Sequence, residues 1–200
     1  MIMLLCAAQY VSQAQEAPAR QEGAADLPKA ALKTNVIYDA TATINLGVEF
    51  ALAPKMTMDI SGDLHPWVLP NGWRLTHYLV QPELRFWLKE RFQGHFFAVN
   101  VLGATYNAGN IRNNFHIMGR DMSALGRYRL EGIAYGAGLG YGYAVRVARH
   151  LNIEMEIGLG YIGAKFDAYR LGEKESLYAQ NSTAQYFGPT KGALNIVYIF

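Results

Sequence analysis

The stretch from Gly132 to Ala164 constrains the fold most, because every second residue in it is apolar over two long runs. The residues between them are mostly glycine and alanine in the first run and include two glutamates in the second. A period of two is typical of β-strands whose faces meet different surroundings. Strands usually have about 5–6 residues, whereas a tilted strand needs about 9–11 to cross a bilayer. The stretch therefore predicts a long hairpin that is able to span a membrane.

The same alternation recurs along most of the chain and predicts eight antiparallel strands. The expected strands are 32–39, 44–52, 56–65, 78–88, roughly 95–106, 132–147, 151–164 and 193–200. Pro82 falls inside the fourth strand, and we expect a local bulge there because proline cannot donate to a β-ladder. The pattern predicts an all-β fold, an eight-stranded antiparallel up-and-down transmembrane β-barrel.

Composition agrees with a membrane barrel. Charged residues make up 17% of the chain, against roughly 25% in soluble domains. Nowhere is there an apolar run of about 18 residues, so a transmembrane helix is not expected, whereas the signal of a barrel strand is much weaker. The formal net charge of +2 gives no indication of a nucleic-acid partner.

The N-terminal part divides into two short segments before the barrel. Residues 1–14 have a short apolar core and end in Ser12-Gln13-Ala14, as expected for a secretory signal. Residues 15–31 are rich in Ala, Gln and Glu and read as a flexible periplasmic lead-in. The barrel is expected over 32–200. Cys6 is the one cysteine, so the exported chain should contain no disulfide.

Loop lengths and aromatic positions favour the bacterial outer membrane. The expected connections are mostly short at one end of the barrel and long at the other, which is the arrangement of periplasmic turns and extracellular loops. Tyrosines, phenylalanines and a tryptophan on the strands gather at two heights, as in the aromatic girdles of such barrels. The apolar faces would then point to lipid. In the alternative, a soluble periplasmic β-barrel carrier, they would point inward.

Three segments carry a family resemblance: Leu32–Thr43, Leu79–Trp87 and Tyr186–Lys191. They resemble an uncharacterised Bacteroidetes family, a domain of unknown function whose members are predicted small outer-membrane barrels. The resemblance covers about 32–200. It implies architecture and location, and it transfers no activity and no site residue. An aromatic residue, Phe200, after an alternating strand is also similar to the signal read by the barrel-insertion machinery, which we expect as a partner beside outer-membrane lipid and lipopolysaccharide.

Charged residues on the expected inner face fall at one level, in the periplasmic half of the lumen. They are Lys33, Glu49, Asp59, Glu83, Arg85, Arg146, Glu154 and Glu156. The interior of an eight-stranded barrel is just wide enough for side chains to fill it. Isolated buried charges are costly, so these groups should pair. We expect a packed ionic plug, with inward glycines from Gly136 to Gly142 leaving room for Arg85, Trp87 and other bulky side chains; a proton or ion path is the alternative.

A metal site and a catalytic pair are weaker hypotheses. His65 and His77, with Asp63 nearby, flank a tryptophan-bearing loop and could bind a metal ion. Rim histidines are more often solvated, so no metal or cofactor is expected.

His116 and Ser123, with Asp121, lie in the loop 107–129 and include a nucleophile and a base. Small outer-membrane barrels include lipid-modifying enzymes, but a serine and a histidine in one loop are common by chance.

The loop 107–129 is basic, with one acid, Asp121, among its arginines. The arginines are Arg112, Arg120, Arg127 and Arg129. Such a loop could contact phosphates or sugar acids of a lipopolysaccharide surface. We therefore expect a non-enzymatic outer-membrane barrel with a structural or surface-interaction role. An outer-membrane enzyme that modifies lipid A or phospholipid, or a soluble carrier, is the alternative.

Overall fold

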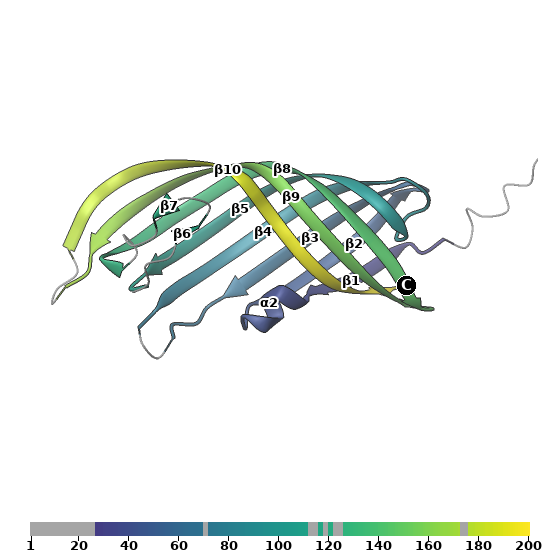
Figure 1. The fold of residues 1–200 in the computed structure, drawn as a ribbon, viewed down its shortest axis with the longest axis horizontal. Helices are drawn as coiled ribbons and strands as arrows, with labels where there is room; N and C mark the ends of the chain where they lie inside the picture. Colours follow the sequence, from purple (N-terminus) through teal and green to yellow (C-terminus); the bar gives the residue numbers. More distant parts are fainter. Residues whose placement is uncertain (1–26, 70–71, 112–115, 118–119, 122–125, 173–175) are drawn as a thin grey trace, which may run out of the picture.

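Eight antiparallel strands close into a barrel in the order β1-β10-β9-β8-β5-β4-β3-β2 (Figure 1). The computed structural model describes residues 27–69, 72–111, 116–117, 120–121, 126–172 and 176–200. The barrel strands are β1 Ala30–Asn35, β2 Ile44–Ala53, β3 Met56–His65, β4 Arg74–Trp87, β5 Gly94–Gly109, β8 Tyr128–Ala148, β9 Leu151–Arg170 and β10 Ser176–Ile199. Strands that follow one another in the sequence pair in space, so the predicted all-β, up-and-down barrel is confirmed.

Three small elements complete the described chain. The helix α2 spans Val36–Ala40, and β6 His116–Ile117 pairs with β7 Arg120–Asp121 in a separate two-stranded sheet. The expected leader 1–14 and residues 15–26 of the expected lead-in lie outside the described residues. No helix among the described residues has the length and apolar character needed to cross a membrane.

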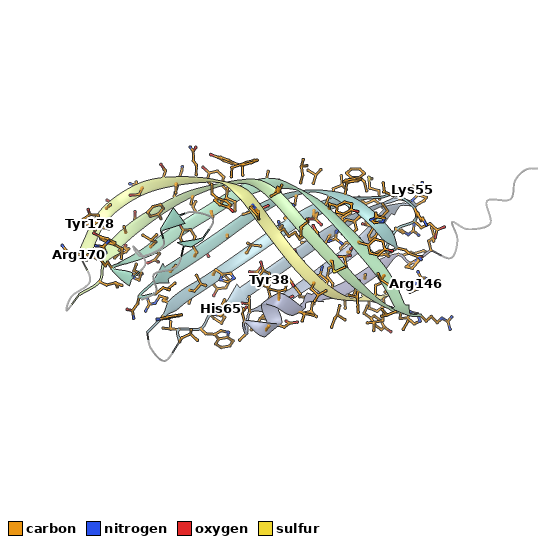
Figure 2. The ribbon with its side chains drawn as sticks, in the orientation of Figure 1. Tyr38, Lys55, His65, Arg146, Arg170 and Tyr178 are labelled. Carbon is orange, nitrogen blue, oxygen red and sulfur yellow. The ribbon has the colours of Figure 1, made fainter. Side chains whose placement is uncertain are left out.

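The connections differ between the two ends of the barrel. At one end, residues 54–55, 88–93 and 149–150 join β2 to β3, β4 to β5 and β8 to β9. At the other end lie α2, residues 66–69 and 72–73, residues 110–111 and 126–127, the small sheet of β6 and β7, and residues 171–172. We call these the turn end and the loop end. Figure 2 shows Lys55 and Arg146 at the turn end and Arg170 and Tyr178 at the loop end.

The first strand is shorter than predicted, because a helix begins inside the expected range 32–39. Asn35 ends β1 and caps α2, since its side-chain Oδ1 accepts a hydrogen bond from the backbone N–H of Ile37 at 3.1 Å. The Asp39 carboxylate accepts from Thr34 Oγ1 at 2.9 Å and from Asn45 Nδ2 at 2.7 Å, which holds the turn against β2. Local side-chain bonds of this kind compete with a β-ladder.

Asn35 also links the first and last strands of the barrel, β1 and β10. The ladder between β1 and β10 runs only over Asn195–Ile199 of β10. Immediately beyond it, the Asn35 Oδ1 accepts from Leu194 N at 3.2 Å, and the Asn35 Nδ2 donates to Gly192 O at 3.4 Å. One side chain therefore holds the seam of the ring and the start of α2 at once.

We expect Asn35→Ala to lower the free energy of unfolding by about 1–3 kcal/mol, because it removes a helix cap and leaves backbone groups at the seam without a partner. Urea unfolding of the protein in detergent micelles measures the change. The control Gln180→Ala, at an exposed position of β10, should shift the midpoint little. Equal shifts for both variants would contradict the role given to Asn35.

The strands at the loop end are longer than predicted. β9 and β10 stay paired up to Arg170 and Ser176, so most of the stretch between the expected strands 151–164 and 193–200 is strand, and the expected loop 107–129 is shortened at both ends. The alternation persists here with its polarity reversed: Lys165 and Gln185 point outward, whereas Phe166 and Tyr186 lie on the inner face. A pattern of outward apolar residues therefore does not predict this part of the strands.

Bulges occur in β10 and not at Pro82. The pairing of β4 keeps one register across Pro82, which stays opposite Ile60 of β3, so the expected bulge there was wrong. In β10 the register shifts between Pro189 and Lys191. The extra residue turns Lys191 to the inner face, opposite Gly158, although Pro189 faces outward opposite Leu159.

Aromatic side chains fill the barrel interior at the turn end. Phe92 comes from the turn between β4 and β5, adopts φ of 64° and is 1% exposed. It packs with Ala31, Val197 and Ile199. The neighbouring Arg91 donates to the backbone carbonyls of Pro28 at 2.6 Å and Leu27 at 2.9 Å, which ties the preceding segment across this end.

Candidate functional site

Arg85 of β4 lies at the centre of a buried ion cluster in the turn-end half of the barrel. Its guanidinium contacts five carboxylates. The distances are 2.7 Å from Nε to Glu83, 3.0 Å from Nη1 to Glu49, 2.9 Å from Nη1 to Glu154, 2.7 Å from Nη2 to Glu156 and 3.2 Å from Nη2 to Asp59. The guanidinium also lies over the Phe96 ring, 4.5 Å from Cζ to the ring centroid. All five N–H donors of this planar fork can thus be engaged.

Two lysines flank Arg85 and divide the carboxylates between them. Lys33 Nζ of β1 binds Glu49, Asp59 at 3.1 Å and Glu154 at 3.7 Å. Lys191 Nζ of β10 binds Glu83 at 2.7 Å and Glu156 at 3.1 Å. Every carboxylate of the cluster therefore contacts Arg85 and one lysine.

Neutral side chains complete the cluster. Thr57 Oγ1 donates to Glu49 and accepts from Trp87 Nε1 at 2.9 Å. Asn195 Nδ2 donates to Glu154 at 2.8 Å. A buried carboxylate is tolerated when its oxygens are bound in this way.

The cluster is buried and has more acidic than basic side chains. Arg85 and Glu49 are 0% exposed, and Asp59 is 1% exposed. Three cations face five carboxylates, which leaves two negative charges in excess. A cavity of about 40 Å³ borders the cluster, enough for about three waters at roughly 10–15 Å³ each. The arrangement holds the charged groups in fixed pairs across the barrel interior.

Glycines of β8 make space for this layer. A Cβ on Gly142 would come within 2.2 Å of the Phe96 ring, and one on Gly140 would come within 2.8 Å of Glu156 Oε1. Phe96 in turn packs against Trp87 with ring centroids 4.7 Å apart. The side chains that use the space are Phe96 and Glu156. The expected neighbours Arg85 and Trp87 instead pack against Phe96.

The structure brings together seven of the eight charged residues expected at this level and adds Lys191. Arg146 is the exception: it is exposed at the turn end of β8, two residues beyond the buried Ala144. Its expected place in the cluster was wrong because the barrel rim is reached there and the long side chain extends into solvent. Lys191 was missed because the last strand was expected to begin at 193. Continuing the alternation from Asn195 through Ala193 by one more step would have found it.

The histidine group at the loop end forms its own small network. His77 Nε2 lies 3.0 Å from Asp63 Oδ1, and the rings of His77 and His65 stack with centroids 5.7 Å apart and planes 4° apart. His65 Nδ1 is 3.0 Å from Thr43 Oγ1. Within the described part of the chain, no three histidine, cysteine, aspartate or glutamate side chains are arranged to hold a metal ion.

The residues considered for catalysis are only partly described. His116 and Asp121 are backbone partners across the small sheet of β6 and β7, whereas Ser123 lies outside the described residues.

The arginines expected to contact anions are also described only in part. Arg112 lies outside the described residues, and Arg120 is part of β7. Arg127 and Arg129 line a cleft of about 630 Å³ at the loop end. Two arginines that the sequence analysis did not single out, Arg74 and Arg170, line the same cleft.

A comparison with known proteins adds a family to this description. A search of curated proteins and of solved structures found no match. Residues 1–200 match the model of a family described as a protein of unknown function, DUF3575. The match includes all eight strands and the buried ion cluster. This chain therefore belongs to the DUF3575 family.

Proposed function

We propose that this protein is an integral outer-membrane β-barrel without catalytic activity, whose lumen is filled by the ion cluster and whose loop end takes part in surface interactions. The proposal rests on the polarity of the two faces of the barrel strands. Over the turn-end part of the barrel the strands point apolar side chains outward and ionised ones inward, the opposite of a soluble barrel.

The outward face forms a continuous apolar band. On β9, Met155, Ile157 and Leu159 are 56%, 71% and 59% exposed, and the outward residues of the other strands follow the same pattern. On β8 the outward apolar residues run from Ile133 to Val147, about 46 Å along the strand at ~3.3 Å per residue. A tilt of about 40° turns this into a height of about 35 Å, enough to cross the apolar band of outer-membrane barrels, which is about 25 Å tall.

The polarity reverses above this band. Outward positions at the loop end carry Glu131, Lys165 and Thr183, all exposed. At the same height the inner face carries Phe166 and Ala168. Apart from the exposed Leu177 near the rim, the upper part of the barrel therefore has the polarity expected in water, and the lower part has that expected in lipid. The boundary between them gives the proposed outer surface of the membrane.

The expected partners follow from this placement. Lipid covers the band, and the loop end would lie among lipopolysaccharide. The outward Tyr198 and Phe200, 49% and 60% exposed beside the turn end, are the feature that the barrel-insertion machinery would recognise.

Membrane fractionation and gel mobility test the proposal. We expect the protein in the outer-membrane fraction, soluble only with detergent, and a change in its gel migration after boiling. Recovery in the periplasm without detergent, with no change of mobility on heating, would contradict the proposal and favour a soluble carrier.

Two further measurements separate a filled, inactive barrel from its alternatives. Purified protein in planar bilayers should show no stepwise porin-like conductance, because the ion cluster closes the lumen. Mass spectrometry of lipid A from cells with and without the gene should show the same acyl and phosphate pattern. Conductance steps would overturn the plug, and a changed lipid A pattern would overturn the non-enzymatic assignment.

A further inference from the structure

The cleft at the loop end is lined by arginines from three strands and the segments that join them. Its residues are Gly72, Arg74, Gly109, Asn110, Gly126, Arg127, Tyr128, Arg129, Arg170, Leu171 and Gly172. No carboxylate is among them, and its volume is about 630 Å³. The cleft therefore gathers four positive charges from parts of the chain that are far apart in the sequence.

Most of these charges are not neutralised by the described part of the protein. Arg129 Nη1 binds Glu131 at 2.6 Å, and its guanidinium lies 4.4 Å from the centroid of the Tyr169 ring. Arg74, Arg127 and Arg170 form no ion pair with any described residue. Three guanidinium groups around one cleft, none of them paired with an acid among the described residues, raise the local potential for anions.

The chemistry of the lining favours phosphate. A guanidinium presents paired N–H donors that match phosphate oxygens, and a phosphate has enough terminal oxygens to accept from more than one arginine. At Gly72 and Gly109 the protein itself fills the space of a side chain, since a Cβ would lie 2.6 Å from Asn110 Nδ2 and 2.8 Å from Arg129. The other two lining glycines, Gly126 and Gly172, have no side chain to keep a ligand from the backbone, where N–H groups can also donate.

The height of the cleft above the apolar band indicates whether its ligand is a membrane lipid or a water-soluble molecule. Arg129 lies four residues beyond Ile133 on β8, about 13 Å along the strand at ~3.3 Å per residue and about 10 Å along the axis at a tilt of about 40°. The headgroup layer extends only about 5–7 Å beyond the hydrocarbon core on each side. The cleft therefore lies beyond the layer of lipid headgroup phosphates. This step rests on the proposed function, because the height is measured from the apolar band.

We propose that this cleft is a binding site for a water-soluble, phosphate-bearing anion. Arg74, Arg127 and Arg170 hold the phosphate groups, and Arg129, fixed by Glu131 and Tyr169, forms one wall. The site is at the end of the barrel opposite Arg146 (Figure 2), which provides a matched control of the same residue type.

Calorimetric titration of the folded full chain in uncharged detergent micelles with inorganic triphosphate tests the proposal. We expect saturable binding that weakens as salt is raised. Arg74→Gln and Arg170→Gln should each weaken it at least about tenfold, the loss expected for a charge-assisted hydrogen bond. Arg146→Gln removes the same charge at the turn end and should leave binding unchanged. The absence of binding, or equal weakening by all three variants, would overturn the proposal.

Two additional measurements distinguish a soluble phosphate from a lipid headgroup and report whether each variant still folds. Micelles that contain short-chain phosphatidic acid should not compete with triphosphate. Competition that Arg170→Gln abolishes would assign the site to a lipid headgroup and overturn the soluble source. Gel mobility before and after boiling is recorded for every variant, so loss of the fold is recognised. Membrane fractionation, in contrast, tests the proposed function independently of anion binding.

Discussion

Replacing Arg85 by methionine is expected to destabilise the barrel by about 3–5 kcal/mol, enough to abolish folding in a marginally stable protein. Arg85 contacts all five carboxylates of the buried cluster. Without it, two lysines would face five acids, and buried charges without partners are costly. Urea unfolding in detergent micelles, followed by gel mobility without boiling, measures the loss.

Two control variants make this prediction specific. Arg146→Met removes an arginine that is exposed at the rim and should change stability by less than about 0.5 kcal/mol. Glu156→Gln keeps size and a hydrogen-bonding oxygen but removes one of the excess negative charges, so we expect it to be tolerated far better than Arg85→Met. If Arg85→Met were as stable as Arg146→Met, the cluster would not hold the barrel together.

Placing arginine at the middle of the apolar band should cost about 2–4 kcal/mol in a bilayer, the penalty for a charge on the lipid face at the membrane midplane. Ile157 is the position of choice, because it is 71% exposed and lies between Ile153 and Tyr161 on the same face of β9. Ile157→Arg leaves the interior of the barrel untouched. Its effect therefore comes from the surroundings of the barrel rather than from its packing. Urea titration of protein folded into phosphatidylcholine vesicles measures it.

Thr183→Arg is the matched control for the apolar band. Thr183 is an exposed outward position above the band, where arginine should cost about 0–1 kcal/mol. The same pair of variants in uncharged detergent with a small micelle should differ less. Equal and small effects at both positions in vesicles would argue that the apolar band does not contact lipid.

The alternation of apolar and polar residues predicted most of the barrel. It placed β3 at its observed bounds and assigned the inner face of β9, with Glu154 and Glu156, and the inner face of β10, with Asn195. A period of two works here because each step along a strand reverses the face. Hence the residues that share the lumen could be named before their distances were known.

The sequence did not reveal features that depend on contacts between distant segments. Asn35 closes the seam of the ring through side-chain bonds to Leu194 and Gly192, which only the closed barrel brings near. The regular alternation of β10 ends at the bulge between Lys191 and Pro189, and bulges shift the register without a clear sequence signal.

The candidate anion site was predicted in part for the same reason. Arg127 and Arg129 were singled out because they lie in one basic stretch of sequence. Arg74 and Arg170 come from the ends of β4 and β9 and line the cleft only because those strands extend beyond the apolar band. They reach the cleft because β4 and β9 are longer than predicted. The sequence pattern did not show this length, because the outward residues at the loop end are polar.

The most direct test of the lipid-facing band is the depth of single outward positions in a bilayer. Cys6 is the one native cysteine, so Ile157→Cys and Thr183→Cys in a Cys6→Ser background can each carry one fluorescent label. In vesicles of phosphatidylcholine brominated on its acyl chains, we expect strong quenching at position 157 and little at position 183. Equal, weak quenching at both positions would contradict a barrel that spans the membrane with its apolar face toward lipid.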